Sequence, residues 1–105
     1  MLRLTLKAGP FQATLAGDKA IEVRRDSQWI RSRLMSSATL EPRSYDVILY
    51  YHAPIFDPHA PVCAVAYAGW LWWAEPITLG PYPNGFRCSF PGPVFVICHG
   101  RVLYP

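Results

Sequence analysis

The chain has 105 residues, of which 51% are hydrophobic and 16% are charged. This length and this apolar content suit one domain, 1–105, with its own core, and they exclude a disordered chain. Eleven prolines and seven glycines indicate many turns and short elements, so a β-rich fold is favoured over a helical bundle.

The formal net charge is +3, and the excess lies between Lys19 and Arg43, where six basic residues stand against three acidic ones. The charges in the rest of the chain cancel. Most of the basic residues are arginines, whose planar guanidinium group binds phosphate and stacks on rings. The excess therefore indicates either a binding site for an anionic partner or a solvated basic face.

The cysteines are odd in number and lie in apolar runs, at positions 63, 88 and 98. This pattern predicts reduced core thiols of a cytoplasmic protein. A zinc site made from these cysteines and the three histidines has no spacing signature, so we expect no metal and no cofactor; the histidines are His52, His59 and His99. The N-terminal residues lack the apolar stretch of a signal peptide, and the longest apolar run, 62–74, is too short for a membrane helix, so we expect no membrane partner.

Strands and helices alternate in the first half of the chain. The hydrophobic patterns predict a strand over 2–7, a short helix over 10–16, a strand over 20–25 and a helix over 27–37. Gly9-Pro10 opens the first helix, and Gly17 closes it. Asp26 or Ser27 caps the second helix.

The second half of the chain is mainly β. It contains predicted strands over 46–52, 62–69 and 94–98, with 101–104 extending or following the last of them. Segment 53–61 is predicted to be a loop, and 76–93 an ordered loop with a tight hairpin at Asn84-Gly85. The predicted fold is α+β: a small closed or nearly closed β-barrel of five to six strands with two short helices packed outside.

Charged and aliphatic side chains alternate along the predicted strand 20–25. Glu22 and Arg24 face one way, and Ile21 and Val23 face the other way, toward the core. Lys19 precedes the strand and can turn to its polar side. The strand therefore brings an ammonium, a carboxylate and a guanidinium together in fixed positions, which suits a ligand with donors and acceptors such as a nucleobase with its phosphate.

The spacing Gly17-x-Lys19-x-x-Glu22-x-Arg24 resembles the G-x-K-x-x-E-x-R motif of the ASCH domains, which belong to the PUA-like β-barrel superfamily. The likeness covers roughly the first thirty residues, and the proline-rich segment 76–93 departs from it. The resemblance implies a PUA-like barrel with a cleft for RNA or nucleotides. It implies that Lys19, Glu22 and Arg24 face the ligand, with Lys7 as a weaker addition.

Aromatic residues accompany the basic segment. Trp29 among the arginines can stack on a base or cover the end of the barrel. Trp70 and Trp72 share one strand face and Trp73 takes the other, so at least one of the three is expected in the core, and one can be a stacking platform. The sequence predicts binding of RNA, single-stranded or modified, or of a nucleotide or nucleoside, through the residues Lys7, Lys19, Glu22, Arg24, Arg25, Trp29 and Arg31.

Two other function classes stand beside binding. Some ASCH-type proteins are hydrolases of modified nucleosides or single-stranded RNA, which would make Lys19, Glu22 and Tyr50 the catalytic candidates; the threonine nucleophile that the amidohydrolases imply is replaced here by Glu22. A protein-interaction or regulatory module would instead use the tryptophan-rich segment and the proline loop as an apolar patch.

Overall fold

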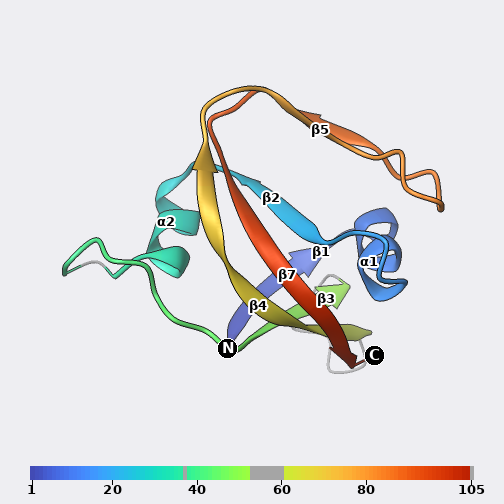
Figure 1. Cartoon of the computed structure of the whole chain (residues 1–105), viewed down its shortest axis with the longest axis horizontal. Helices are drawn as coiled ribbons and strands as arrows, with labels where there is room; N and C mark the ends of the chain where they lie inside the picture. Colours follow the sequence, from blue (N-terminus) through green and yellow to red (C-terminus); the bar gives the residue numbers. More distant parts are fainter. Residues whose placement is uncertain (37, 53–60, 105) are drawn as a thin grey trace.

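The structure, a computed structural model, describes residues 1–36, 38–52 and 61–104. In this part of the chain two helices and seven strands follow one another (Figure 1): β1 (Leu2–Leu6), α1 (Ala8–Leu15), β2 (Ile21–Arg25), α2 (Gln28–Leu34), β3 (Val47–His52), β4 (Val62–Trp73), β5 (Ile77–Leu79), β6 (Cys88–Phe90) and β7 (Val94–Tyr104). Of the predicted loop 53–61, only Pro61 is among the described residues. His59 lies outside them.

Five strands form one curled sheet in the order β1-β3-β4-β7-β2. The β1–β3 pair is parallel and the other pairs are antiparallel. Figure 1 shows the long strands β4 and β7 side by side through the centre of the molecule. The α+β class and the presence of two helices are as predicted, but both helices contribute to the main apolar cluster instead of packing outside a barrel. The sheet is a half-barrel with two edges, because β1 and β2 stand at the two ends of the strand order.

The apolar side chains gather in two clusters. The larger cluster covers the concave face of the sheet and takes in Phe11 from α1 and Ile30 and Leu34 from α2. The smaller cluster lies on the other face, where Val23 packs with Leu79 and two residues of β7. Glu22 and Arg24 therefore point to the concave side, and the aliphatic residues of β2 point to the smaller cluster.

The prediction of a loop over 76–93 is wrong in part. Residues 77–79 and 88–90 pair as a short antiparallel hairpin, β5–β6. Its connection, residues 80–87, is longer than the predicted tight hairpin at Asn84-Gly85, and it contains a turn closed by the hydrogen bond from the Gly85 N–H to the Tyr82 carbonyl (2.8 Å). The many prolines hid the alternation of Ile77 and Leu79, which face the smaller cluster. The hairpin therefore adds an ordered arm to the half-barrel (Figure 1).

Strand β4 runs through Gly69 to Trp73 and includes Trp70, Trp72 and Trp73, in agreement with the strand spacing predicted for the tryptophans. Residues 101–104 likewise extend β7. Trp70 packs against the core, with its ring 5.0 Å from that of Phe95 in an edge-to-face arrangement. Trp72 and Trp73 are 47% and 46% exposed. The expectation of at least one core tryptophan is met by Trp70.

Helix α2 is capped by Ser27, whose Oγ accepts a hydrogen bond from the backbone N–H of Ile30 (3.2 Å). It ends earlier than predicted, because Met35 is extended (φ −128°) and bridges to Pro42. Neither helix in the described ranges has the length and apolarity that a membrane crossing needs.

Replacing the cap residue, Ser27→Ala, is expected to lower the free energy of unfolding by about 1 kcal/mol, since a helix N–H loses its acceptor. Urea denaturation measures this loss. The matched control is Ser32→Ala in the same helix, where alanine is the better helix former, so its stability should stay level or rise slightly. Equal losses in both variants would contradict the role of the cap.

Candidate functional site

Three charged side chains meet on the concave side of β2. Lys19 Nζ donates to Glu22 Oε1 (2.8 Å), and Arg24 Nε donates to Glu22 Oε2 (2.9 Å). The side chains are 1%, 8% and 25% exposed for Lys19, Glu22 and Arg24 respectively. One buried carboxylate therefore holds two cations, as the alternation along the strand predicted.

The chain turns sharply between α1 and β2 to place Lys19. Gly17 adopts a left-handed conformation (φ +81°) at the end of the helix, which a glycine accepts without strain. The backbone N–H groups of Asp18 and Lys19 then both donate to the Ala13 carbonyl (3.0 and 3.1 Å). These bonds fix Lys19 next to the start of β2, so its ammonium reaches Glu22.

Arg24 also joins the two edges of the sheet. Its Nη2 donates to the backbone carbonyl of Thr5 on β1 (2.6 Å). Because β1 and β2 are the end strands of the curled sheet, this side chain bridges the seam of the half-barrel.

A cleft of about 610 Å³ opens beside the three charged residues. It lies between the edge strands, the start of α1 and the β5–β6 hairpin, and its lining residues are Thr5, Leu6, Lys7, Pro10, Lys19, Glu22, Val23, Arg24, Leu79, Phe86, Cys88 and Phe90. The cleft therefore has a charged floor and an apolar wall.

The apolar wall comes from the segment that the sequence predicted as a loop. Asn84 Nδ2 donates to the Gly9 carbonyl (2.9 Å), which ties the hairpin to α1. At Gly9 an added Cβ would come within 3.1 Å of the Phe86 ring, so the two segments are in close contact. Sequence reasoning missed Phe86 and Phe90 as site residues. The weak alternation at 77–79 and 88–90 was the signal that could have found them.

A buried tyrosine–histidine pair lies near the charged triad, which is the group Lys19, Glu22 and Arg24. The Tyr50 hydroxyl and His99 Nε2 are hydrogen-bonded, and Tyr50 is fully buried. Burial, and then the negative charge of Glu22, raise the pKa of Tyr50 well above its ordinary value. Burial, and then the positive charge of Lys19, lower the pKa of His99 to about 4. Both groups are therefore uncharged at neutral pH.

His99 was not singled out from the sequence. It follows Phe95 and Ile97 at a spacing of two on β7, and both of these face the core. This periodicity was the available signal. Tyr50 is not among the residues that line the cleft.

The structure brings together four of the predicted binding residues: Lys7, Lys19, Glu22 and Arg24 all line the cleft. The other three lie outside it. Arg25 is exposed and takes the opposite face of β2. Arg31 pairs with Asp26 through two hydrogen bonds (2.5 and 2.6 Å). Trp29 is 48% exposed.

Trp29 and its neighbours form a separate exposed group. The guanidinium of Arg33 lies 4.5 Å from the centroid of the Trp29 ring. Trp72 Nε1 donates to Asp26 Oδ2 (3.1 Å). Aromatic and basic side chains of this segment therefore contact one another and Asp26, away from the cleft.

The cysteines are free thiols, and Cys63 is buried in the core. Burial raises the pKa of Cys63 and of Cys88, so both hold their protons at neutral pH. Within residues 1–36, 38–52 and 61–104, no three histidine, cysteine or acidic side chains are grouped closely enough to hold a metal ion.

The chain is thus a small α+β domain with a curled half-barrel sheet and a charged cleft at its seam. The sequence matches no protein-family model, and no curated protein and no solved structure matches it. The resemblance to the ASCH domains therefore stays a prediction, and it depends on Gly17, Lys19, Glu22 and Arg24.

Proposed function

We propose that the cleft binds a nucleotide, free or as a unit of single-stranded RNA, in a PUA-like domain of the ASCH type. The observation that carries the proposal is the charge imbalance at the cleft floor. Lys19 and Arg24 share the single carboxylate of Glu22, and Lys7 adds a third cation at the rim. An anionic ligand such as phosphate would balance this excess.

The cations keep hydrogen-bonding capacity for a ligand. An ammonium has three donors and a guanidinium has five, and among the described residues Lys19 Nζ uses one and Arg24 uses Nε and Nη2. Both oxygens of Glu22 accept hydrogen bonds from these cations. Glu22 is therefore the positioning residue, and Lys7 and Arg24 are the phosphate-binding residues. Lys19, whose side chain is 1% exposed, adds its charge from below the cleft floor.

The apolar wall suits the base of the same nucleotide. Phe86 stacks with Tyr82 at 6.0 Å between ring centroids, and Phe86 and Phe90 line the cleft. Aromatic side chains stack on bases of any sequence. A cleft of this size admits one extruded base, so single strands are favoured over a duplex.

The hydrolase alternatives find less support in the geometry. The Tyr50 hydroxyl is buried with His99, outside the cleft lining. The nucleophilic threonine of the amidohydrolases is absent, and the one sulfur of the lining, Cys88, has a pKa raised by burial. Binding needs none of these groups to react. It is therefore the function that the cleft supports best.

We expect the double variant Lys7→Gln/Arg24→Gln to weaken binding of adenosine 5′-monophosphate and of a uridine hexanucleotide at least tenfold. The salt dependence of hexanucleotide affinity should fall by about 0.7 per cation removed, since each cation releases a counterion from the strand. Isothermal titration at several salt concentrations measures both quantities.

The matched control is Arg25→Gln, which removes a cation from the same strand on the face that does not line the cleft. Its affinity and salt dependence for adenosine 5′-monophosphate should equal those of the unaltered protein. Equal losses in both variants would refute binding in the cleft, because they would indicate attraction to the basic surface as a whole.

A further inference from the structure

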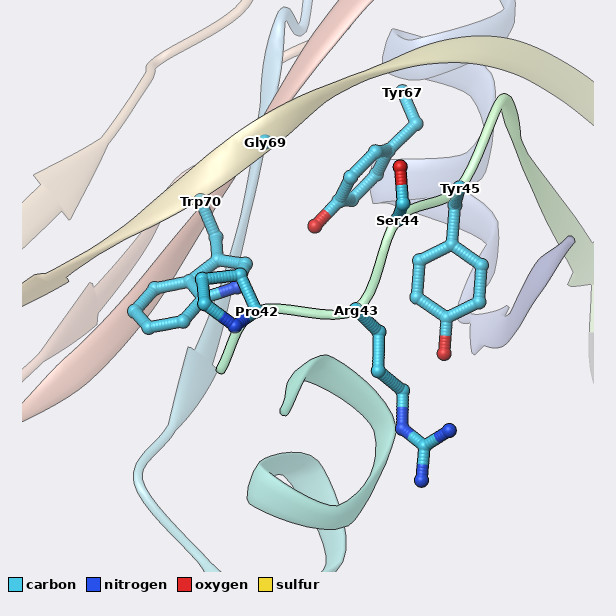
Figure 2. A pocket seen from close by; sticks show the side chains of 7 residues that line it. All are labelled: Pro42, Arg43, Ser44, Tyr45, Tyr67, Gly69 and Trp70. Carbon is cyan, nitrogen blue, oxygen red and sulfur yellow. The ribbon is translucent and has the colours of Figure 1, made fainter. Parts of the chain in front are cut away.

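A second pocket, of about 360 Å³, shares no lining residue with the cleft. One wall is the segment before β3, and the other is the middle of β4 (Figure 2). The lining residues are Pro42, Arg43, Ser44, Tyr45, Tyr67, Gly69 and Trp70. Nothing in the proposed function of the cleft uses this pocket.

A β-bulge in β4 creates the pocket. Tyr67 pairs with His99 and Trp70 pairs with Ile97. Between these two pairs β4 therefore has one residue more than β7. Without the bulge, Tyr67 and Trp70 would point to opposite faces; with it, they point to the same one. The extra length is taken up beside Gly69, whose φ is +93°. An added Cβ there would meet nothing within 4 Å, so the pocket has room at this point.

Two polar atoms of the pocket lack partners. Tyr67 Oη and Trp70 Nε1 are buried, and neither makes a hydrogen bond within the described part of the chain. Figure 2 shows the Tyr67 hydroxyl directed into the space between Trp70 and the 42–45 segment. Buried polar atoms are nearly always hydrogen-bonded, so both atoms call for a partner beyond the described residues.

The wall of the pocket that faces β4 is held in place by hydrogen bonds. The Arg43 N–H donates to the Leu34 carbonyl (2.8 Å), and Arg43 Nε donates to the Met35 carbonyl (3.1 Å). The Tyr45 hydroxyl donates to the Arg33 carbonyl. These bonds anchor the segment to the end of α2, and the Tyr45 and Tyr67 rings then meet edge to face at 5.4 Å.

The unpartnered atoms define the ligand chemistry. Trp70 Nε1 only donates, whereas a tyrosine hydroxyl donates and accepts. Burial raises the pKa of Tyr67, so its hydroxyl keeps the proton at neutral pH. A carbonyl beside an N–H, the lactam edge of a ring, supplies an acceptor for Trp70 Nε1 and a donor for Tyr67 Oη. The tyrosine and tryptophan rings suit a flat molecule.

We propose that this pocket binds an uncharged planar ring through its lactam edge, with the ring carbonyl accepting from Trp70 Nε1 and the ring N–H donating to Tyr67 Oη. The same edge occurs in free lactam heterocycles and in the uracil units of RNA. The proposal concerns other residues than the cleft and does not rest on nucleotide binding there.

The test uses free uracil as the probe and follows the Trp70 indole N–H resonance, which is assigned by its loss in Trp70→Phe. Uracil should shift this resonance saturably. Tyr67→Phe and Trp70→Phe should each weaken uracil binding at least tenfold, with affinity measured by calorimetry. Both variants remove an unpartnered polar atom and keep an aromatic ring, so both should fold. Trp73→Phe, outside the pocket, is the control and should bind as before.

Two comparisons complete the test. 1,3-Dimethyluracil keeps the carbonyls and lacks the N–H donors, so it should bind at least tenfold more weakly than uracil. A uridine hexanucleotide that shifts the Trp70 resonance at lower concentration than uracil would assign the source of the ring to RNA, and an equal or weaker effect would assign it to free heterocycles.

The Lys7→Gln/Arg24→Gln variant should bind uracil unchanged, which separates this site from the cleft. No saturable shift with uracil or the hexanucleotide, or full affinity in Tyr67→Phe, would overturn the proposal and leave water as the partner of both atoms.

Discussion

Replacing Glu22 with glutamine is expected to lower the free energy of unfolding by about 3–5 kcal/mol, because it leaves two cations without their shared carboxylate. Lys19 is 1% exposed, so its ammonium cannot recover hydration in place of the lost ion pair. Arg24 loses one of the two hydrogen-bond acceptors that hold it at the seam of the sheet. Glutamine keeps the shape of the side chain, so the loss reports on charge.

Urea denaturation of Glu22→Gln against the unaltered protein measures this effect. The matched control is Glu75→Gln, an exposed glutamate, which should change stability by less than about 0.5 kcal/mol. Adding Lys19→Met to Glu22→Gln should recover part of the lost stability, because the buried ammonium of Lys19 is then removed as well. A loss in Glu22→Gln no larger than in Glu75→Gln would show that the triad is fully solvated.

Stability should fall by about 2 kcal/mol as the pH is lowered from 7 to 4.5, through His99 alone. The pKa of His99 is lowered from 6.5 to about 4 in the folded protein. Between these values the unfolded chain takes up a proton that the folded protein does not bind. The free energy of unfolding therefore decreases as the pH falls. The stability that the uncharged His99 contributes is lost once the pH passes below the pKa of His99 in the folded protein.

The measurement is urea denaturation at pH 7, 6, 5 and 4.5. The lower limit keeps the titration of Asp26 out of the window, since hydrogen bonding to Arg31 lowers the pKa of that carboxyl below 3.8. His99→Gln should flatten the pH dependence, and the control His52→Gln should retain it. An unchanged slope in His99→Gln would assign the dependence to other groups.

The cleft floor could be predicted from the sequence because it depends on local rules. The period of two along β2 puts Glu22 and Arg24 on one face, and the glycine turn before the strand brings Lys19 to the same side. Both rules operate within eight residues. The structure confirms both features, and predicting them needed no information about the rest of the chain.

The cleft wall and the second pocket could not be predicted, because they depend on distant partners. Phe86 becomes a wall residue only because the hairpin docks on Gly9. Tyr67 and Trp70 share a face only because β4 bulges against β7. A regular alternation assigned to β4 alone gives the wrong face for one of them.

The basic segment shows a further difference between composition and structure. Its excess charge suggested that Arg31 would serve the ligand, and Arg31 is instead paired with Asp26. The arginines of α2 contact neighbouring side chains: Arg31 is hydrogen-bonded to Asp26, and Arg33 lies over the Trp29 ring. Net charge along a chain does not reveal such pairing.

The seam at Arg24 has a consequence for the order of folding. Strand β2 is laddered to residues 94–98 of β7, far along the chain, and β1 is laddered to β3. The contact between Arg24 and Thr5 can therefore form only after both long-range pairings are in place. Such pairings form slowly, because a large loop must close before they stabilise the chain. We expect binding competence to appear in the slowest refolding phase, so that an intact cleft marks a chain whose sheet is fully assembled.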